Sequence, residues 1–327
     1  MRFKIPCKKY RLPHFSGHSG KSVRIRTLTL VLAVVSLAVQ ADAQLHHAAE
    51  DERAVFWSIH HGGEPAGHVL GTIHSEDSRV LDFSEDFLGK LRANKLFAME
   101  LVPDLPTLEQ LTQHMRYEPG KTLESVVGPE RFTALVEALS AYRVPEEFIR
   151  RMKPWAAMLT LSTPPPETGF FMDFSLSLRA SGSGLKVVGL ETLEQQLSFL
   201  EDMPLAMQLD LLDQAIAESG TVQQAHDQML DAYLENDLQN LQTLSNEQLR
   251  DVGVEAHAYF TDAGIVARNH RMLESLLPQL EHNSVFVAVG ALHLPGEEGL
   301  LNLLRRHGYE LIPLEMPFID AENVPAR

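Results

Sequence analysis

Residues 285–293 read Val-Phe-Val-Ala-Val-Gly-Ala-Leu-His, and this stretch decides the fold class of the chain. Five consecutive apolar residues, three of them β-branched valines, are typical of a strand covered on both faces, as in the parallel sheets of α/β proteins. Residues 69–74, Val-Leu-Gly-Thr-Ile-His, have the same arrangement near the other end of the chain. In both places an apolar run leads into the spacing Gly-x-x-His. Each therefore predicts a buried strand that ends close to a histidine.

Other apolar runs predict further strands of the same sheet. The six expected strands are residues 55–59, 68–73, 95–101, 186–190, 285–289 and 309–314. They come from the beginning, the middle and the end of the chain. We therefore expect an α/β (α+β) fold with a central mixed sheet, flanked by helical insertions at about 105–170 and 200–280. The repeated Gly-x-x-His spacing is also compatible with a duplicated half.

Helical patterns fill the segments between the predicted strands. Gly128-Pro129 opens one helix, since proline suits the first helical position. Thr192 and Gln195 form a capping box that predicts the start of another helix. Apolar residues spaced along 222–244 predict one long helix. Residues 295–307 predict a last helix, which would place the preceding histidine at a helix N-terminus, where N–H groups favour an anion.

The first 43 residues have the parts of a secretory signal peptide. Eight Lys or Arg precede an apolar run over 28–39, and Ala41-Asp42-Ala43 is a small-residue cleavage site. The run is shorter than the ~20 residues that span a bilayer as a helix. We expect cleavage near Ala43, a single domain over 44–327, and a periplasmic or secreted protein with no stable membrane anchor. An uncleaved anchor is the alternative.

Charge and cysteine content limit the function classes. Loss of the leader would change the formal net charge from −16 to −23, because the leader carries eight basic residues and one acidic residue. So acidic a chain argues against binding nucleic acid through bulk electrostatics. The single cysteine, Cys7, lies in the leader, so the remainder has no thiol for a disulfide, a nucleophile or a metal ligand. The sequence leaves the oligomeric state open.

Four predicted strands end on ionisable residues, namely His74, Glu100, Glu191 and His293. Ligands of open α/β sheets bind beyond the carboxyl ends of the strands, so convergence of these side chains would form a metal site or an acid–base site. Taken singly, each histidine is typical of a hydrogen-bonded structural residue, and each glutamate of a helix-capping or salt-bridging residue. No His-Glu-x-x-His or Gly-x-Ser-x-Gly motif is present.

The basic segment Arg268-Asn269-His270-Arg271 follows an alanine-containing helical stretch at 254–267. By itself this pattern indicates a solvated basic turn. An arginine brought to the strand ends would instead clamp a carboxylate or stabilise an oxyanion.

In combination and order, several segments resemble the TraB/GumN group, which is related to the Tiki proteins and more distantly to erythromycin-esterase-like folds. The resemblance covers roughly residues 53–315. It rests on Gly71-Thr-Ile-His74, Met99-Glu100-Leu101, Lys153-Pro154-Trp155, Met172-Asp173-Phe174, Val188-Gly-Leu-Glu-Thr192 with Gln195, Arg268-Asn269, Val289-Gly-Ala-Leu-His293 and residues 304–309. The segment at 163–171, Thr-Pro-Pro-Pro-Glu-Thr-Gly-Phe-Phe, departs from the family pattern, so the region covering the substrate is the least transferable.

The resemblance implies a metal-dependent, peptidase-like hydrolase, with a peptide or a small molecule as the expected substrate. Carried over to this sequence, His74 and His293 become metal ligands, and Glu100 becomes a ligand or general base. Arg268 becomes a clamp for the substrate or the oxyanion.

Glu191 and Asp173 are second candidates for the catalytic carboxylate. A Mn²⁺, Co²⁺ or Zn²⁺ ion would lower the pKa of bound water from about 15.7 toward ~7, and a glutamate would move its proton. Two alternatives stay open: a metal-independent esterase or amidase with a histidine general base, and a non-catalytic protein that binds a peptide or another ligand.

Overall fold

The computed structural model describes residues 53–318, and the strands in this range form one sheet in the order β4-β3-β5-β2-β1-β6. The predicted leader, with Cys7 and the cleavage site at Ala43, lies outside the described residues. The strands are β1 (Phe56–His61), β2 (Glu64–Thr72), β3 (Leu96–Met99), β4 (Lys186–Gly189), β5 (Val285–Gly290) and β6 (Tyr309–Pro313). The predicted α/β fold with a central mixed sheet is confirmed, and each expected strand is present within a few residues of its expected bounds.

The directions of the strands determine which strand ends, with their predicted site residues, lie at the same edge of the sheet. Strands β4, β3, β5 and β2 run parallel to one another, whereas β1 runs antiparallel to both β2 and β6. Glycines at 62 and 63, both with positive φ, form the tight connection from β1 to β2. Because the four parallel strands point the same way, their carboxyl ends meet at one edge of the sheet.

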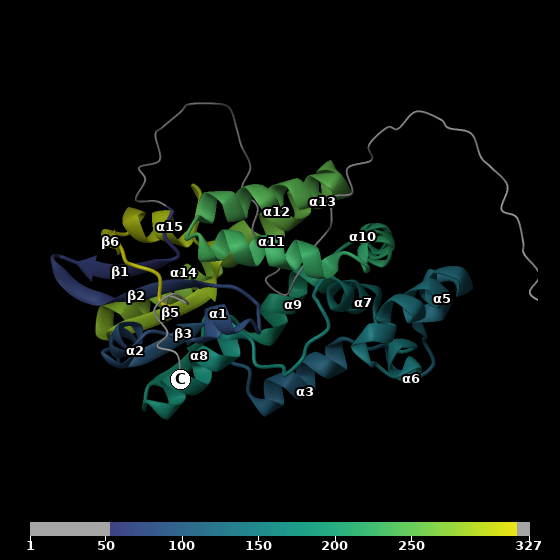
Figure 1. The fold of residues 1–327 in the computed structure, drawn as a ribbon, viewed down its shortest axis with the longest axis horizontal. Helices are drawn as coiled ribbons and strands as arrows, with labels where there is room; N and C mark the ends of the chain where they lie inside the picture. The colour runs from purple at the N-terminus through teal and green to yellow at the C-terminus, as the bar shows by residue number, and fades with distance from the viewer. Residues whose placement is uncertain (1–52, 319–327) are drawn as a thin grey trace, which may run out of the picture.

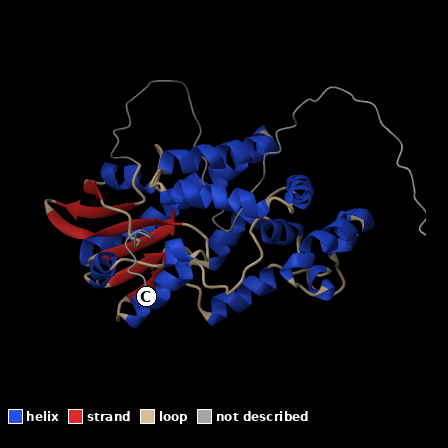
Figure 2. Cartoon of the chain, viewed as in Figure 1, coloured by secondary structure: helices blue, strands red, loops and turns tan. Residues whose placement is uncertain are grey.

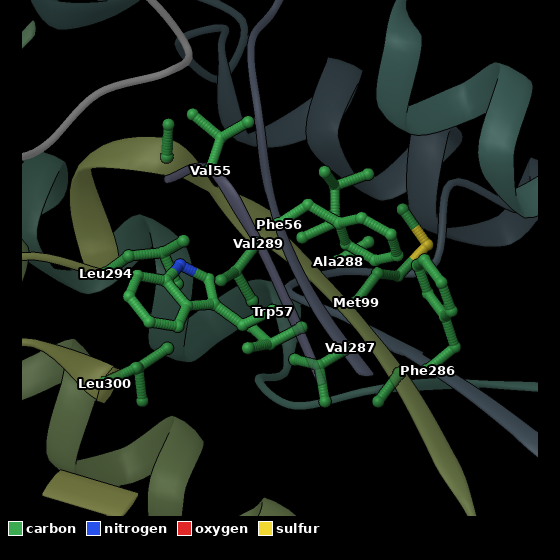
Figure 3. Close-up of a cluster of buried hydrophobic side chains, with 14 of the residues drawn as sticks. Val55, Phe56, Trp57, Met99, Phe286, Val287, Ala288, Val289, Leu294 and Leu300 are labelled. Atoms are coloured by element: carbon green, nitrogen blue, oxygen red, sulfur yellow. The ribbon is translucent and has the colours of Figure 1, made fainter. Parts of the chain in front are cut away.

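The sheet is the centre of one hydrophobic core. Five of the six residues of β5 are buried, as the continuous apolar run predicts. Phe286 contacts the rings of Phe56, Phe87 and Phe97, and Trp57 lies near Leu294 and Leu300 on the other side of the strands (Figure 3). Each buried Phe or Val side chain contributes ~1.5–3 kcal/mol, so this cluster fixes β5 at the middle of the sheet.

Helices surround the sheet and form a second apolar cluster at the other end of the molecule. The strands lie on the left in Figures 1 and 2, and α5, α6, α7 and α10 gather on the right. The second cluster includes Leu135, Trp155, Leu197 and Leu211. The helices of the first half are α1 (Ser78–Leu81), α2 (Glu85–Arg92), α3 (Leu105–His114), α4 (Leu123–Val127), α5 (Pro129–Ala138), α6 (Glu146–Ile149) and α7 (Pro154–Leu161). Those of the second half are α8 (Met172–Gly182), α9 (Leu193–Glu201), α10 (Leu205–Glu218), α11 (Val222–Leu234), α12 (Leu238–Val252), α13 (Val254–Tyr259), the π-helix η3 (Phe260–Val266), α14 (Ala267–His282) and α15 (Leu300–Arg306).

The single long helix predicted over 222–244 is wrong, because the chain breaks between α11 and α12 at residues 235–237. Asn236 has a φ of 58°, a left-handed conformation that asparagine tolerates better than most residues. Its side-chain Oδ1 accepts the Val55 N–H at 2.8 Å. The break therefore ties the helical segment to the start of β1.

The predicted helix over 295–307 is also wrong at its beginning. Gly296 has a φ of 90°, so residues 295–299 form turns, and α15 begins at Leu300. His293 lies instead in the short 3-10 helix η4 (Ala291–His293). The capping box of Thr192 and Gln195 at the start of α9 is confirmed. In the range 53–318, the helices are all too short or too polar to cross a membrane.

We predict that Gly71→Ala destabilises the fold and that Gly89→Ala does not. A Cβ at Gly71 would lie 2.7 Å from the Ala291 Cα, and such overpacking costs ~1–3 kcal/mol. Gly89 is exposed in α2 with open space around it, so alanine there stabilises the helix by up to ~1 kcal/mol. Urea denaturation of the chain from Gln44 measures both effects. A Gly71→Ala variant as stable as the wild type would contradict the close approach of β2 and η4.

Candidate functional site

The predicted site residues follow the carboxyl ends of the parallel strands. Glu100 comes directly after β3, and Glu191 comes two residues after β4. His74 follows β2, and His293 follows β5. The main chain joins two of these ends, since the Glu191 N–H donates to the Glu100 carbonyl oxygen at 2.9 Å. The parallel sheet thus brings all four residues to one edge.

Arg268 binds both predicted glutamates. Its Nε and Nη2 atoms donate to Glu191 Oε2 at 2.8 and 2.6 Å, and Nη2 also donates to Glu100 Oε2 at 2.6 Å. Only 2% of the Arg268 side chain is exposed, and Glu191 is wholly enclosed. Buried charges are tolerated when they are paired in this way. The interpretation of residues 268–271 as a solvated basic turn is therefore wrong, because these residues lie in α14 and Arg268 is neutralised by two distant carboxylates.

Glu100 is held in its ionised form. Its Oε1 accepts the Gly290 N–H at 2.8 Å, and its Oε2 accepts from Arg268 and, at 3.3 Å, from Gln196. Burial alone would raise the pKa of Glu100, but the nearby positive charge of Arg268 and the hydrogen bonds from Gly290 and Arg268 lower it to about 2. A Cβ at Gly290 would lie 3.2 Å from Glu100 Oε1. The glycine of the second Gly-x-x-His motif therefore lets the carboxylate reach the main chain.

His293 is oriented by Asn269, the neighbour of Arg268 in α14. The Asn269 amide nitrogen donates to the Glu298 carbonyl oxygen at 2.7 Å, so its Oδ1 faces the histidine. His293 Nδ1 lies 2.6 Å from this Oδ1. We infer that Nδ1 carries the proton and that Nε2 has a free lone pair. Nε2 faces Glu100 Oε1 at 3.7 Å, beyond hydrogen-bond distance.

Burial sets the charge of this histidine. Only 2% of the His293 side chain is exposed, and desolvation lowers its pKa to about 3, with Arg268 acting in the same direction and Glu100 opposing it. The imidazole is therefore neutral at physiological pH. An acceptor nitrogen and a carboxylate oxygen that face each other without a proton between them repel, and a cation or a hydrogen-bond donor placed between them would relieve the repulsion.

His74 belongs to a second group on the same edge. Its Nδ1 lies 3.9 Å from Asp173 Oδ2, and its ring stacks on Phe171 with centroids 3.7 Å apart. Asp173, at the start of α8, also accepts a hydrogen bond from Thr72 Oγ1 at 2.5 Å. The structure therefore places Asp173 beside His74. Between residues 53 and 318, no three His, Cys, Asp or Glu side chains gather closely enough to hold one metal ion.

One cavity of about 380 Å³ connects the two groups. Glu100, Arg268 and Gly290 line it from the first group, and His74 and Asp173 from the second. Most of its other walls are apolar side chains from α3, α9, the first turn of α8 and the segment before it, including Leu108, Leu111, Leu197, Leu200, Phe171 and Phe174. The cavity thus lies between the carboxyl edge of the sheet and the helical cluster. Neither Glu191 nor His293 is among its lining residues; His293 lies behind the cavity wall and faces Glu100.

The sequence did not predict two contacts of the site: that of Asn269 with His293 and that of Gln196 with Glu100. A signal for Asn269 exists in α14, where Met272, Leu273, Leu276 and Leu280 form the buried stripe. Extending this stripe by one helical turn toward the N-terminus gives Arg268 and Asn269. Polar residues on the apolar face of a helix must find buried partners, which these two do. Gln196 lies on a capped helix with no comparable signal.

The sequence matches the TraB/PrgY/gumN family over residues 55–313, and the chain belongs to this family. Two curated relatives are similar to most of it. Metalloprotease TIKI1 of Danio rerio is 22% identical over 313 residues, which are 80% of this chain and 63% of the relative. Metalloprotease TIKI1 of Xenopus tropicalis is 23% identical over 340 residues, which are 86% of this chain and 66% of the relative. The chain thus spans just under two thirds of the length of these relatives. No solved structure matches it significantly.

We expect Arg268→Met to destabilise the protein strongly, because it leaves Glu100 without its buried counter-charge and Glu191 with only the partly exposed Arg271 at 3.5 Å. Breaking a buried ion pair by removing one partner costs ~3–5 kcal/mol. Arg131→Met is the matched control, since Arg131 pairs with Asp213 at the surface and its loss costs at most ~1 kcal/mol. Urea denaturation gives both values.

A second variant keeps this prediction testable if Arg268→Met does not fold. Adding Glu191→Gln removes one of the uncompensated charges and should restore part of the lost stability. An Arg268→Met protein that unfolds at the same urea concentration as the control would show that the buried pair contributes nothing.

Proposed function

We propose that this member of the TraB/PrgY/gumN family is an exported, metal-dependent hydrolase with peptidase-like activity at the carboxyl edge of its sheet. One observation carries the proposal: His293 Nε2 and Glu100 Oε1 face each other at 3.7 Å beside a cavity, with Asn269 holding the other ring nitrogen. The metalloprotease names of the two relatives support the reaction class. The sequence of residues 1–43 supports export.

The donor atoms of this pair fit a divalent ion. A neutral imidazole nitrogen and a carboxylate oxygen are ligands that suit Mn²⁺, Co²⁺ and Zn²⁺. Ligating histidines usually donate their other N–H to a neighbouring oxygen, which is the role of Asn269 Oδ1 here. We assign His293 and Glu100 as two ligands. His74 is the proposed third, because it lines the same cavity, although its present contacts are Asp173 and Phe171.

The remaining residues have distinct proposed roles. When bound, a divalent ion supplies Lewis acidity that activates water and polarises a carbonyl group. Asp173, with 32% of its side chain exposed at the cavity, is better placed than Glu191 to move a proton to or from a substrate. Glu191 is enclosed and bound to Arg268, so it positions that arginine. Arg268 holds Glu100 in place, and its action as a substrate clamp stays a prediction.

The decisive experiment is the metal content of the chain from Gln44 after reloading with Mn²⁺, Co²⁺ or Zn²⁺ and desalting, measured by elemental mass spectrometry. We expect near-stoichiometric metal in the wild type and none in His293→Ala, with the fold intact by circular dichroism. His270→Ala is the matched control, because His270 is exposed and contacts Glu298. Asn269→Leu should weaken metal binding about 10- to 100-fold, since it removes the partner that orients His293.

The metal contents of these variants decide which residues are metal ligands and whether the protein depends on a metal. Metal retained by His74→Ala would remove His74 from the ligand set. Wild type that binds none of the three ions would refute metal dependence. Cleavage of a peptide library by the metal-free protein would then favour a histidine general base, and binding without cleavage would favour a peptide-binding protein.

A further inference from the structure

The geometry points to Phe171 as a specificity-determining residue that divides the space around His74 into two compartments, with Glu76 as the residue that positions it. This inference rests on the proposed function, since it assigns substrate selection at the same site. Phe171 belongs to the segment 163–171, which departs from the family pattern.

Two cavities meet at this residue. The first is the cavity of about 380 Å³ described above, whose walls are mostly apolar. The second has a volume of about 330 Å³ and is lined by polar residues, among them Ser75, Glu76, Gln223 and Asp227. His74 and Phe171 line both cavities. These two side chains are therefore the wall between an apolar and a polar compartment.

The wall is a stacked pair of rings. The centroids of His74 and Phe171 are 3.7 Å apart and their planes differ by 18°, so the phenyl ring covers one face of the imidazole. With the phenyl ring in place, a substrate group can approach His74 from the apolar compartment only beside that ring. Removing the ring would join the compartments along the exposed face of His74. The size of the side chain at position 171 therefore limits which substrate groups fit next to His74.

Glu76 fixes the segment that carries Phe171. Its carboxylate accepts the main-chain N–H groups of Glu167 at 2.7 Å, of Thr168 at 3.2 Å and of Gly169, and it also accepts the Thr168 hydroxyl. Three successive N–H groups that point at one carboxylate form an anion-binding nest. The preceding prolines at 164–166 have no N–H groups to tie the segment down. Glu76 therefore supplies the anchor of this segment.

The anchor also couples Phe171 to His74 along the chain. Glu76 lies two residues after His74, and the Ser75 carbonyl oxygen accepts the Met172 N–H at 3.0 Å. The segment is thus attached to residues 75 and 76 on both sides of Phe171. Displacement of this anchor would move the phenyl ring and uncover the imidazole together.

Histidine NMR tests the wall without any need for hydrolysis. Ring protons of His74 that lie over the Phe171 ring are shielded, so Phe171→Ala should move their signals downfield in protein with labelled histidine. Phe170→Ala is the matched control, because Phe170 is exposed and leans on Phe174 without lining either cavity. Assignment of the signals comes from a His74→Ala sample. Unchanged His74 signals in Phe171→Ala would overturn the proposed wall.

Cleavage of a peptide library tests specificity. We expect Phe171→Ala to raise kcat/KM for peptides with Trp or Phe next to the cleaved bond, relative to Ala at that position, by about tenfold or more, while Phe170→Ala keeps the wild-type preference. Glu76→Gln should reproduce both effects of Phe171→Ala, because an amide presents only one acceptor oxygen to the nest. Glu76→Asp, which retains the carboxylate, should restore part of the wild-type behaviour.

The His74 NMR signals and the cleavage preference together distinguish failure of this inference from failure of the proposed function. Hydrolysis with an unchanged preference in Phe171→Ala would overturn the role of Phe171 in specificity while leaving the hydrolase in place. Absence of hydrolysis in every protein, wild type included, would reject the proposed function and the specificity role with it. The His74 signals would then still decide whether Phe171 forms the wall.

Discussion

The buried contact of Arg268 with Glu100 and Glu191 is the interaction on which the site depends. It joins α14 to the ends of β3 and β4, and it places a single guanidinium against two carboxylates. Because a charge removed from water needs a partner, loss of Arg268 would strand buried carboxylate charge at the ends of both strands. The contact also fixes Glu100 against the Gly290 N–H and brings the adjacent Asn269 to His293. One ion-pair cluster thus sets the positions of both proposed ligands on this side of the cavity.

The two Gly-x-x-His motifs need their glycines for different reasons. At Gly71 the main chain approaches the Ala291 Cα so closely that a methyl group has no room, and the contact packs β2 against the turn after β5. At Gly290 the missing Cβ leaves space for the Glu100 carboxylate. The same spacing therefore serves strand packing in the first motif and the chemistry of the site in the second. The histidines differ accordingly, since His293 is enclosed and hydrogen-bonded while His74 is partly exposed and stacked.

Local patterns were enough to predict the strands and their carboxyl edge, because a continuous apolar run such as 285–289 has few alternatives to a buried strand. They were not enough for the contacts that complete the site. The local sequence pattern indicated a solvated Arg268, because its partners are 77 and 168 residues away in the sequence. The break at Asn236 depends on a hydrogen bond to Val55, and the turn before α15 depends on a positive φ at Gly296. The strand ends predicted that His74 and His293 lie on one edge of the sheet, but their joint role as metal ligands followed the resemblance, which carries no information on the segment at 163–171.

The apolar walls of the cavity determine how strongly the charged groups that line it attract a cation or a polar group. Interactions between charges grow as the local dielectric falls, so the Glu100 carboxylate attracts a cation more strongly beside apolar walls such as Leu197 and Leu200 than it would in water. The same walls would exclude water from a substrate bound there and strengthen its contacts with fixed dipoles. An apolar cavity lined at one end by the Glu100 carboxylate, which His293 Nε2 faces at 3.7 Å, is therefore suited to holding a cation or a polarised group.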